Sequence, residues 1–200
     1  MLVAAVMAAP MGANADVKTF RIKNDGGSKV SFSSDAPLET MTGVSSVVSG
    51  SATVDLDNLS KTKGTVEVPV KSLRTGVDLR DEHLRGKNWL NAKEHPNVHF
   101  EIVEVKGAKK LVANKATKLK VRGKFTVHGI TQFVTTTGTA RWIPLTDEMK
   151  KTPGITGDVL RIKLSFRVNL TDHQVSVPSI VRLKVANDID VSVDLRAMAK

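Results

Sequence analysis

Residues 160–170 read LRIKLSFRVNL, and this stretch decides the fold. Every second position is a large apolar residue: Leu160, Ile162, Leu164, Phe166, Val168 and Leu170. The intervening residues are basic or polar. A period of two residues places alternate side chains on opposite faces of a β-strand. The pattern therefore predicts one long strand with a dry face and a wet face.

Two other stretches repeat this alternation. One carries the apolar set Leu119, Val121, Phe125 and Val127, and the other carries Val185, Ile189, Val191, Val193 and Leu195. Gly123 interrupts the first set, as expected where a curved sheet bends or carries a bulge. Both stretches are predicted to be long strands that are polar on one face.

Seven further strands are expected from shorter runs, separated by turn-forming residues. They cover residues 17–22, 29–33, 42–48, 50–56, 65–73, 98–105 and 132–142. Long alternating strands favour a closed antiparallel sheet, because closure removes the exposed edges. A two-sheet sandwich is the competing fold, but its strands are usually shorter and recur every 8–12 residues.

Residues 77–92, VDLRDEHLRGKNWLNA, break the alternation. Asp78 is positioned to cap a helix, with Asp81 and Glu82 in its first turn. The sequence predicts a short helical excursion in this segment, between two strands.

Composition limits the function classes. The chain has 200 residues and a formal charge of +10, which favours anionic partners such as phospholipid headgroups. The basic residues are scattered and aromatic residues are only 4%, so nucleic-acid binding is not indicated. Cysteine is absent, which excludes disulfides and thiolate metal sites. An anionic membrane surface stays open as a partner, and so does a homodimer.

Residues 1–15, MLVAAVMAAPMGANA, have the apolar core and the small-residue ending of a secretory signal peptide. The segment is too short to span a bilayer, which needs about 20 apolar residues. We expect export and a mature chain that begins at Asp16, so that residues 16–200 form one domain. A basic leading segment is missing, which leaves the true start of translation open.

Residues 72–100 carry a resemblance to a known family. The stretch SLRTGVDLRDEHLRGKNWLNAKEHPNVHF resembles the YceI pattern of a Ser-Leu pair, a Thr-Gly, an Arg-Asp-x-His-Leu and a closing Pro-x-x-x-Phe region. Residues 121–131, 169–178 and 185–197 are similar to later motifs of the same family, in the same order. Two departures stand out: His173 replaces the usual aromatic residue, and Phe125 replaces a common leucine.

The resemblance implies an eight-stranded, antiparallel, lipocalin-like barrel that binds a polyisoprenoid or another long lipid in its interior. It also implies a periplasmic or secreted protein without catalytic activity or cofactor. A barrel of about eight strands has room for one such ligand. The predicted function is to bind, and to carry or store, a long apolar or amphiphilic ligand.

Two groups of residues are candidates for ligand contact. The cavity lining is predicted to include Trp89, Phe100, Val121, Phe125, Val127, Ile162, Leu164, Phe166 and Val168. The charged lid is predicted to include Arg80, Asp81, His83 and Arg85. These charged residues either anchor the helix over one end of the barrel or meet an anionic headgroup at its mouth.

No catalytic or metal site is predicted. His95 and His99 are four residues apart, but Pro96 and the start of a strand lie between them, so they do not form a helical zinc pair. The sequence lacks the G-x-S-x-G, P-loop and dinucleotide-binding motifs. An enzyme that acts on a lipid or redox carrier, and a protein that binds membranes through its basic surface, are the alternative functions.

Overall fold

A computed structural model describes residues 16–199. Its strands are β1 (Val17–Ile22), β2 (Lys29–Ala36), β3 (Glu39–Ser45), β4 (Ser49–Asp55), β5 (Lys63–Pro69), β6 (Asn97–Lys106), β7 (Thr117–Val127), β8 (Ile130–Ile143), β9 (Val159–Asn169) and β10 (Asp188–Ala199). The helices are α1 (Asp78–Arg85) and α2 (Asp147–Lys150), with short 3-10 turns η1 (Leu59–Lys61), η2 (Val70–Ser72), η3 (Thr171–His173) and η4 (Ser179–Val181). The predicted signal peptide, residues 1–15, lies outside the described residues.

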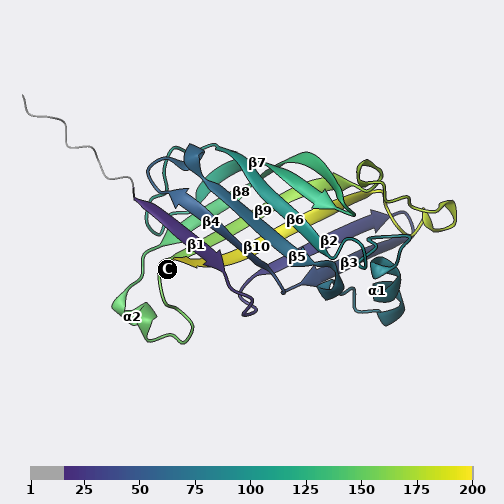
Figure 1. The fold of residues 1–200 in the computed structure, drawn as a ribbon, viewed down its shortest axis with the longest axis horizontal. Coiled ribbons are helices and arrows are strands. Elements are labelled where there is room, and N and C mark those ends of the chain that lie inside the picture. The colour runs from purple at the N-terminus through teal and green to yellow at the C-terminus, as the bar shows by residue number, and fades with distance from the viewer. Residues whose placement is uncertain (1–15, 200) are drawn as a thin grey trace, which may run out of the picture.

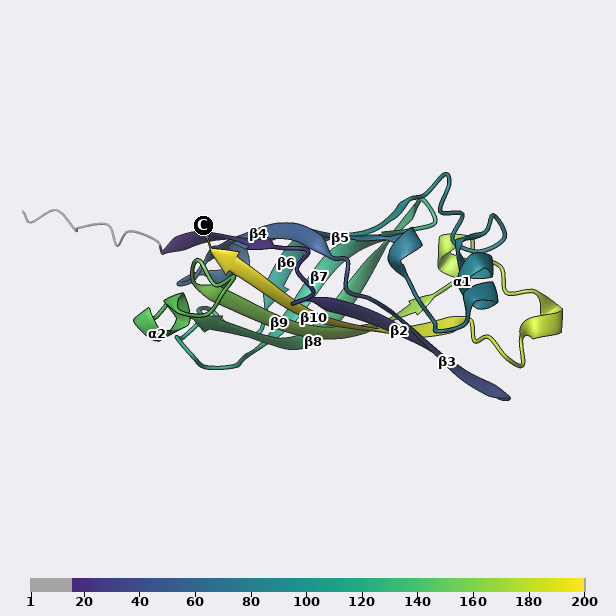
Figure 2. The same cartoon turned by 90° about the horizontal axis from the view of Figure 1, so that it is seen from below.

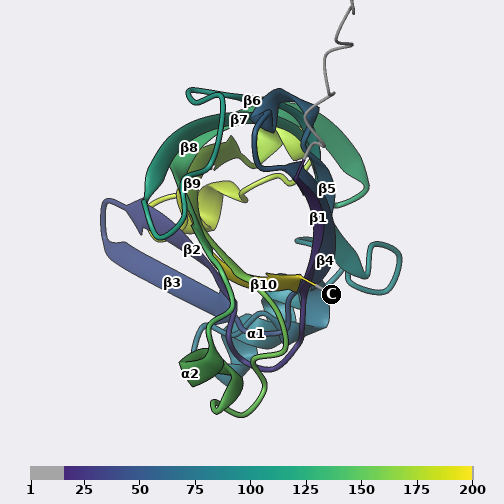
Figure 3. The same ribbon diagram turned by 90° about the vertical axis from the view of Figure 1, so that its left-hand side faces the viewer.

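Eight strands form a closed antiparallel ring in the order β1-β4-β5-β6-β7-β8-β9-β10. The ring closes where Phe20, Arg21 and Ile22 of β1 pair with Ala199, Met198 and Ala197 of β10. Figure 3 looks along the barrel from the end where α2 lies. The predicted eight-stranded barrel is confirmed.

The hairpin of β2 and β3 extends this ring on one side. β10 pairs with β1 through its last residues and with β2 through residues 189–194. At the changeover, the buried Ser28 hydroxyl accepts a hydrogen bond from the Arg196 backbone N–H and lies 3.3 Å from the Arg196 carbonyl oxygen. The side chain thus replaces a missing strand partner, because a buried backbone group without a hydrogen bond is costly.

The alternation of residues 160–170 has the predicted effect. The outward residues of β9 pair with carboxylates of β10: Arg161 contacts Asp194 at 2.7 Å, and Arg167 contacts Asp190 at 2.8 Å. The apolar residues of the same strand face the barrel interior, where they belong to the two cores or pack against them. One face of β9 is therefore polar and the other apolar.

Two hydrophobic clusters fill the ends of the barrel. The first lies toward α1 and includes Val70, Leu73, Leu90 and Val175. The second lies toward the opposite end and includes Phe20, Leu56, Leu59 and Leu111. Figures 1 and 2 show α1 at one end of the long axis and α2 at the other. The barrel is thus packed at both ends.

The segment around α1 differs in detail from the prediction. The helix covers Asp78–Arg85, and the rest of residues 77–92 forms turns. The prediction that Asp78 caps the helix is wrong. Val77 is the N-cap residue, and its side chain makes no capping hydrogen bond. The fifth strand ends at Pro69 rather than at residue 73, because η2 follows directly. Within residues 16–199, no helix is long and apolar enough to cross a membrane.

Gly123 lies where β6 and β7 change register, between the pairs Ile102–Gly123 and Glu104–Arg122. The predicted irregularity is therefore confirmed, with the extra residue on β6. The Phe100 ring packs over Gly123, and a Cβ atom there would overlap this ring and lie 2.7 Å from the Glu101 carbonyl oxygen. The absence of a side chain allows this close approach.

We predict that Gly123→Val lowers the free energy of unfolding by about 1–3 kcal/mol, because the added side chain overpacks the interior. Urea denaturation followed by circular dichroism measures the change. Lys120→Val, at an exposed position of the same strand, is the control and should leave the midpoint nearly unchanged. Equal midpoints for wild type and Gly123→Val would contradict the close packing.

Candidate functional site: an apolar cavity inside the barrel

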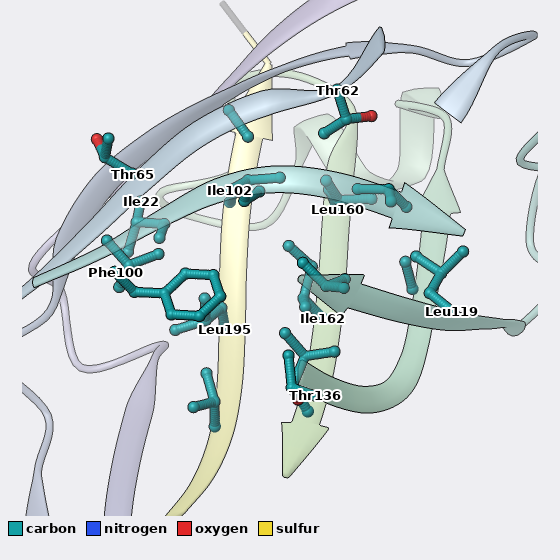
Figure 4. Close-up of a pocket in the computed structure, with 18 of the residues that line it drawn as sticks. Ile22, Thr62, Thr65, Phe100, Ile102, Leu119, Thr136, Leu160, Ile162 and Leu195 are labelled. Atoms are coloured by element: carbon teal, nitrogen blue, oxygen red, sulfur yellow. The ribbon is translucent and has the colours of Figure 1, made fainter. Parts of the chain in front are cut away.

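A cavity lies inside the barrel between its two packed ends. Its volume is about 130 Å³. Figure 4 shows Phe100 of β6, Ile162 of β9 and Leu195 of β10 among the lining side chains. The wall draws on β1, β2 and β4 to β10, together with the segments around η1 and Leu111.

The cavity wall is almost entirely apolar. Among the described residues, the 28 that line it include no charged side chain, and the polar ones are Ser51, Thr62, Thr65 and Thr136. The Thr136 hydroxyl donates a 2.9 Å hydrogen bond to the Ser165 carbonyl oxygen, so it offers no free donor. Thr62 is 7% exposed, and its hydroxyl has no hydrogen-bond partner among residues 16–199. The cavity therefore suits a hydrocarbon chain that carries few polar atoms.

Six of the nine predicted lining residues lie on this wall: Phe100, Val121, Phe125, Ile162, Leu164 and Phe166. The Phe166 ring is 5.3 Å from the Phe125 ring, in an edge-on contact, and 6.2 Å from the Phe100 ring. The other three, Trp89, Val127 and Val168, do not line the cavity. They belong to the packed cluster at the α1 end or contact it.

Several lining residues escaped the sequence analysis. Leu59, Thr62 and Leu111 come from segments between strands, where no periodic pattern points inward. Backbone hydrogen bonds connect these segments. The Leu59 N–H donates to the Lys109 carbonyl oxygen, and the Leu111 N–H donates to the Leu56 carbonyl oxygen. Ala140 was missed because small residues of β8 give no apolar alternation. Only the closed sheet shows that these residues face one cavity.

The predicted charged lid is organised around Asp81. Its side chain is 4% exposed, and Oδ1 accepts hydrogen bonds from the Thr75 N–H and hydroxyl, both at 2.7 Å. Burial acts to raise the pKa of Asp81. The hydrogen bonds from Thr75 and the nearby Arg85 and Arg74 outweigh it, so the pKa lies below its ordinary value. Asp81 is thus held as an anion.

The other three lid residues have unequal roles. Arg80 bonds to the Thr75 hydroxyl at 3.0 Å and to Glu39 at 2.8 Å, which joins α1 to the start of β3. Arg85 lies 3.7 Å from Asp81 and donates to the Leu73 carbonyl oxygen. His83 is exposed. These contacts describe an anchor for α1, and the cavity wall contains none of the four residues.

Asp81→Asn is predicted to lower stability at pH 7 by roughly 1–3 kcal/mol, because it weakens a buried charged hydrogen-bond network. A carboxyl with a lowered folded pKa stabilises the fold above its unfolded pKa, near 3.8, and this contribution disappears as the pH falls through the folded pKa. The difference between wild type and variant should therefore shrink at acid pH.

Urea denaturation at several pH values between about 2.5 and 7 measures this difference. This range covers the titration of the carboxyl group. Glu82→Gln, an exposed neighbour in α1, is the matched control and should show no comparable loss. A stability gap for Asp81→Asn that stays constant down to the lowest pH would contradict the role of the charge.

Three of the five histidines, His95, His128 and His173, lie close together near the β7–β8 turn. His173 is 1% exposed, and its Nδ1 donates to the Ile130 carbonyl oxygen at 2.9 Å. Its ring meets the Phe125 ring edge-on, with 5.5 Å between the ring centroids, so the imidazole packs as an aromatic ring in the core. His95 contacts the His128 ring at the β7–β8 turn, and His99 lies 3.3 Å from Glu67. Across residues 16–199, no three acidic or histidine side chains gather as metal ligands.

The fold and the cavity define a class of protein: antiparallel β-barrels that enclose an apolar interior. Comparison with known proteins identifies the family. The YceI-like domain profile matches residues 21–197, so the chain belongs to the YceI-like family. A UPF0312 protein of Photorhabdus laumondii is 34% identical over 83 residues, which are 42% of this chain and 40% of that protein. The chain thus matches less than half the length of this curated relative.

Two solved structures share the fold. BcnA of Burkholderia cenocepacia superimposes with a TM-score of 0.70 and 18% identity, over 88% of this chain and 99% of that chain. A polyisoprenoid binding domain from Saccharophagus degradans, implicated in plant cell wall breakdown, gives a TM-score of 0.67 and 12% identity, over 92% and 100% of the two chains. At these identities the similarity shows the common architecture.

Proposed function

We propose that this protein binds a long apolar or amphiphilic molecule, of the polyisoprenoid or fatty-acid type, inside the barrel. The observation that carries the proposal is the uncharged, almost wholly apolar wall of the cavity. Membership of the YceI-like family and the shared fold with a polyisoprenoid binding domain support the same ligand class.

The energetics favour a flexible chain over a compact polar ligand. Each buried methylene contributes about 0.8 kcal/mol, so about ten methylenes contribute about 8 kcal/mol before the cost of association. Because the wall supplies only hydroxyl groups as polar contacts, binding depends on buried length rather than on one strong contact. Chains longer than the cavity would have to displace the packed residues at one of its ends.

The proposal makes the chain a binding protein rather than an enzyme. Asp81 and His173, which are both buried, are engaged in hydrogen bonds that hold the fold. The cavity wall offers hydroxyls without a neighbouring base to activate them. The ligand would therefore be released unchanged.

Filling the cavity should abolish lipid binding. Ala140 is buried and lines the cavity, so Ala140→Phe places a ring in the space that the ligand needs. Thr135→Phe adds the same ring at an exposed position of the same strand and is the matched control.

Native mass spectrometry and lipid extraction should be applied to wild type and both variants, purified from the natural host. We expect a co-purified lipid with wild type and Thr135→Phe, and at least a tenfold loss with Ala140→Phe, which corresponds to about 1.4 kcal/mol. A wild-type protein that is reproducibly free of lipid would overturn the proposal.

We further propose that the protein carries or stores this lipid in the cell envelope, in the periplasm or outside the cell. The support is the signal-peptide pattern of residues 1–15, with its small-residue ending at Ala13 and Ala15. A long lipid is poorly soluble in water, and an exported barrel would hold it between membranes.

Intact-mass analysis of the protein from host cell fractions tests the location. We expect a mature chain that begins at Asp16 and is recovered in the envelope or secreted fraction, because the peptidase cleaves after Ala15. A chain that keeps residues 1–15 and is recovered with cytoplasmic markers would contradict export.

A further inference from the structure

Three exposed apolar side chains project together at the α1 end of the molecule. Leu38, in the β2–β3 turn, is 68% exposed, Ile180 in η4 is 91% exposed, and Leu183 is 58% exposed. The Leu38 N–H donates a 2.8 Å hydrogen bond to the Leu183 carbonyl oxygen, which fixes the two segments side by side. We name these three residues the apolar tip.

The apolar tip lies at one extreme of the long axis. Figures 1 and 2 show the yellow-green segment that contains η4 at this extreme, beyond the barrel strands and on the same side as α1. Ile180 and Leu183 are three residues apart in a turn closed by hydrogen bonds from Val181 to Pro178 and from Lys184 to Val181. This spacing places their side chains on one face of the turn.

Two basic residues flank the apolar tip on the η4 side. Arg182 and Lys184 are both exposed, and neither forms an ion pair with any described residue. Residues 174–187 contain no acidic residue. Glu39, next to Leu38, is bonded to Arg80 at 2.8 Å and so is neutralised.

The surface around α1 is acidic and does not belong to the basic surface beside η4. Leu79 is also exposed at this end, at 62%. However, Asp78 and Glu82 flank it and are exposed, so this part of the surface would repel anions. The favourable surface therefore consists of the apolar tip with Arg182 and Lys184.

We propose that this surface docks the protein on an anionic phospholipid bilayer. Apolar side chains that project between basic residues enter the boundary between headgroups and acyl chains, while the cations meet the lipid phosphates. A protein partner fits less well, because a stable interface needs about 800 Å² from each side, and three projecting side chains cannot supply it. The proposal is independent of what the cavity holds.

Vesicle flotation tests the proposal with the full mature chain. Wild type should float with vesicles that contain phosphatidylglycerol and phosphatidylethanolamine, and should bind vesicles of pure phosphatidylcholine about tenfold less. High salt should weaken the binding, because it screens the attraction between exposed charges. Ile180→Ser combined with Leu183→Ser, and separately Arg182→Gln combined with Lys184→Gln, should each reduce binding about tenfold.

Two controls keep the result specific. Val112→Ser removes an exposed apolar side chain far from η4, at 46% exposure, and should leave vesicle binding unchanged. Ala140→Phe should also leave it unchanged, which separates docking on the bilayer from extraction of a lipid into the cavity. The Ile180→Ser single variant provides a test in which folding is not at risk, because the side chain is almost fully exposed.

The proposal is overturned if wild type fails to bind phosphatidylglycerol vesicles, or if both tip variants bind as well as wild type. It is also overturned if sedimentation shows a dimer that Ile180→Ser converts to a monomer while vesicle binding is unaffected. In that case the apolar tip would be a contact between two copies of the chain.

Discussion

The pairing of β1 with β10 is the constraint on which the rest of the structure depends. Three residues of β1, Phe20 to Ile22, reach the last residues of β10 and turn a curved sheet into a ring. Closure gives every ring strand a neighbour on both sides, and the packing of both ends turns one face of each strand toward an enclosed interior. The inner face must then be apolar, and the outer face carries ion pairs such as Arg161–Asp194 and Arg167–Asp190.

The cavity follows from how this ring is filled. At the α1 end, Leu73, Leu90 and Val175 pack across the barrel, and at the other end Leu59 and Leu111 do so. Between these groups the side chains line an apolar space instead of meeting. The hydrogen-bonded charges of Arg80 and Asp81 hold α1 beside the first group of residues and outside the cavity. The apolar cavity and the polar anchor of α1 are thus separated along the barrel axis.

Much of this could be predicted from the sequence, because alternation reports directly on the two faces of a strand. Residues 160–170 predicted β9, and alternation in this stretch and in residues 119–127 pointed to five of the six predicted residues that lie on the cavity wall. Val127 and Val168 have the same inward orientation but lie at the packed end, since alternation shows which face is buried and not how far along the barrel a residue lies. Trp89, Leu59 and Leu111 come from irregular segments, for which no periodic signal exists.

The sequence by itself indicated the main strands and the family, because a period of two and a specific motif around Arg80 to Leu84 are local properties. The tertiary structure decided what depends on distant residues. It closed the ring through β1 and β10, and it placed the β2–β3 turn against the segment after η4 through the Leu38–Leu183 hydrogen bond. It also decided which buried residues line the cavity, since a cavity forms only where side chains from many strands do not pack against one another.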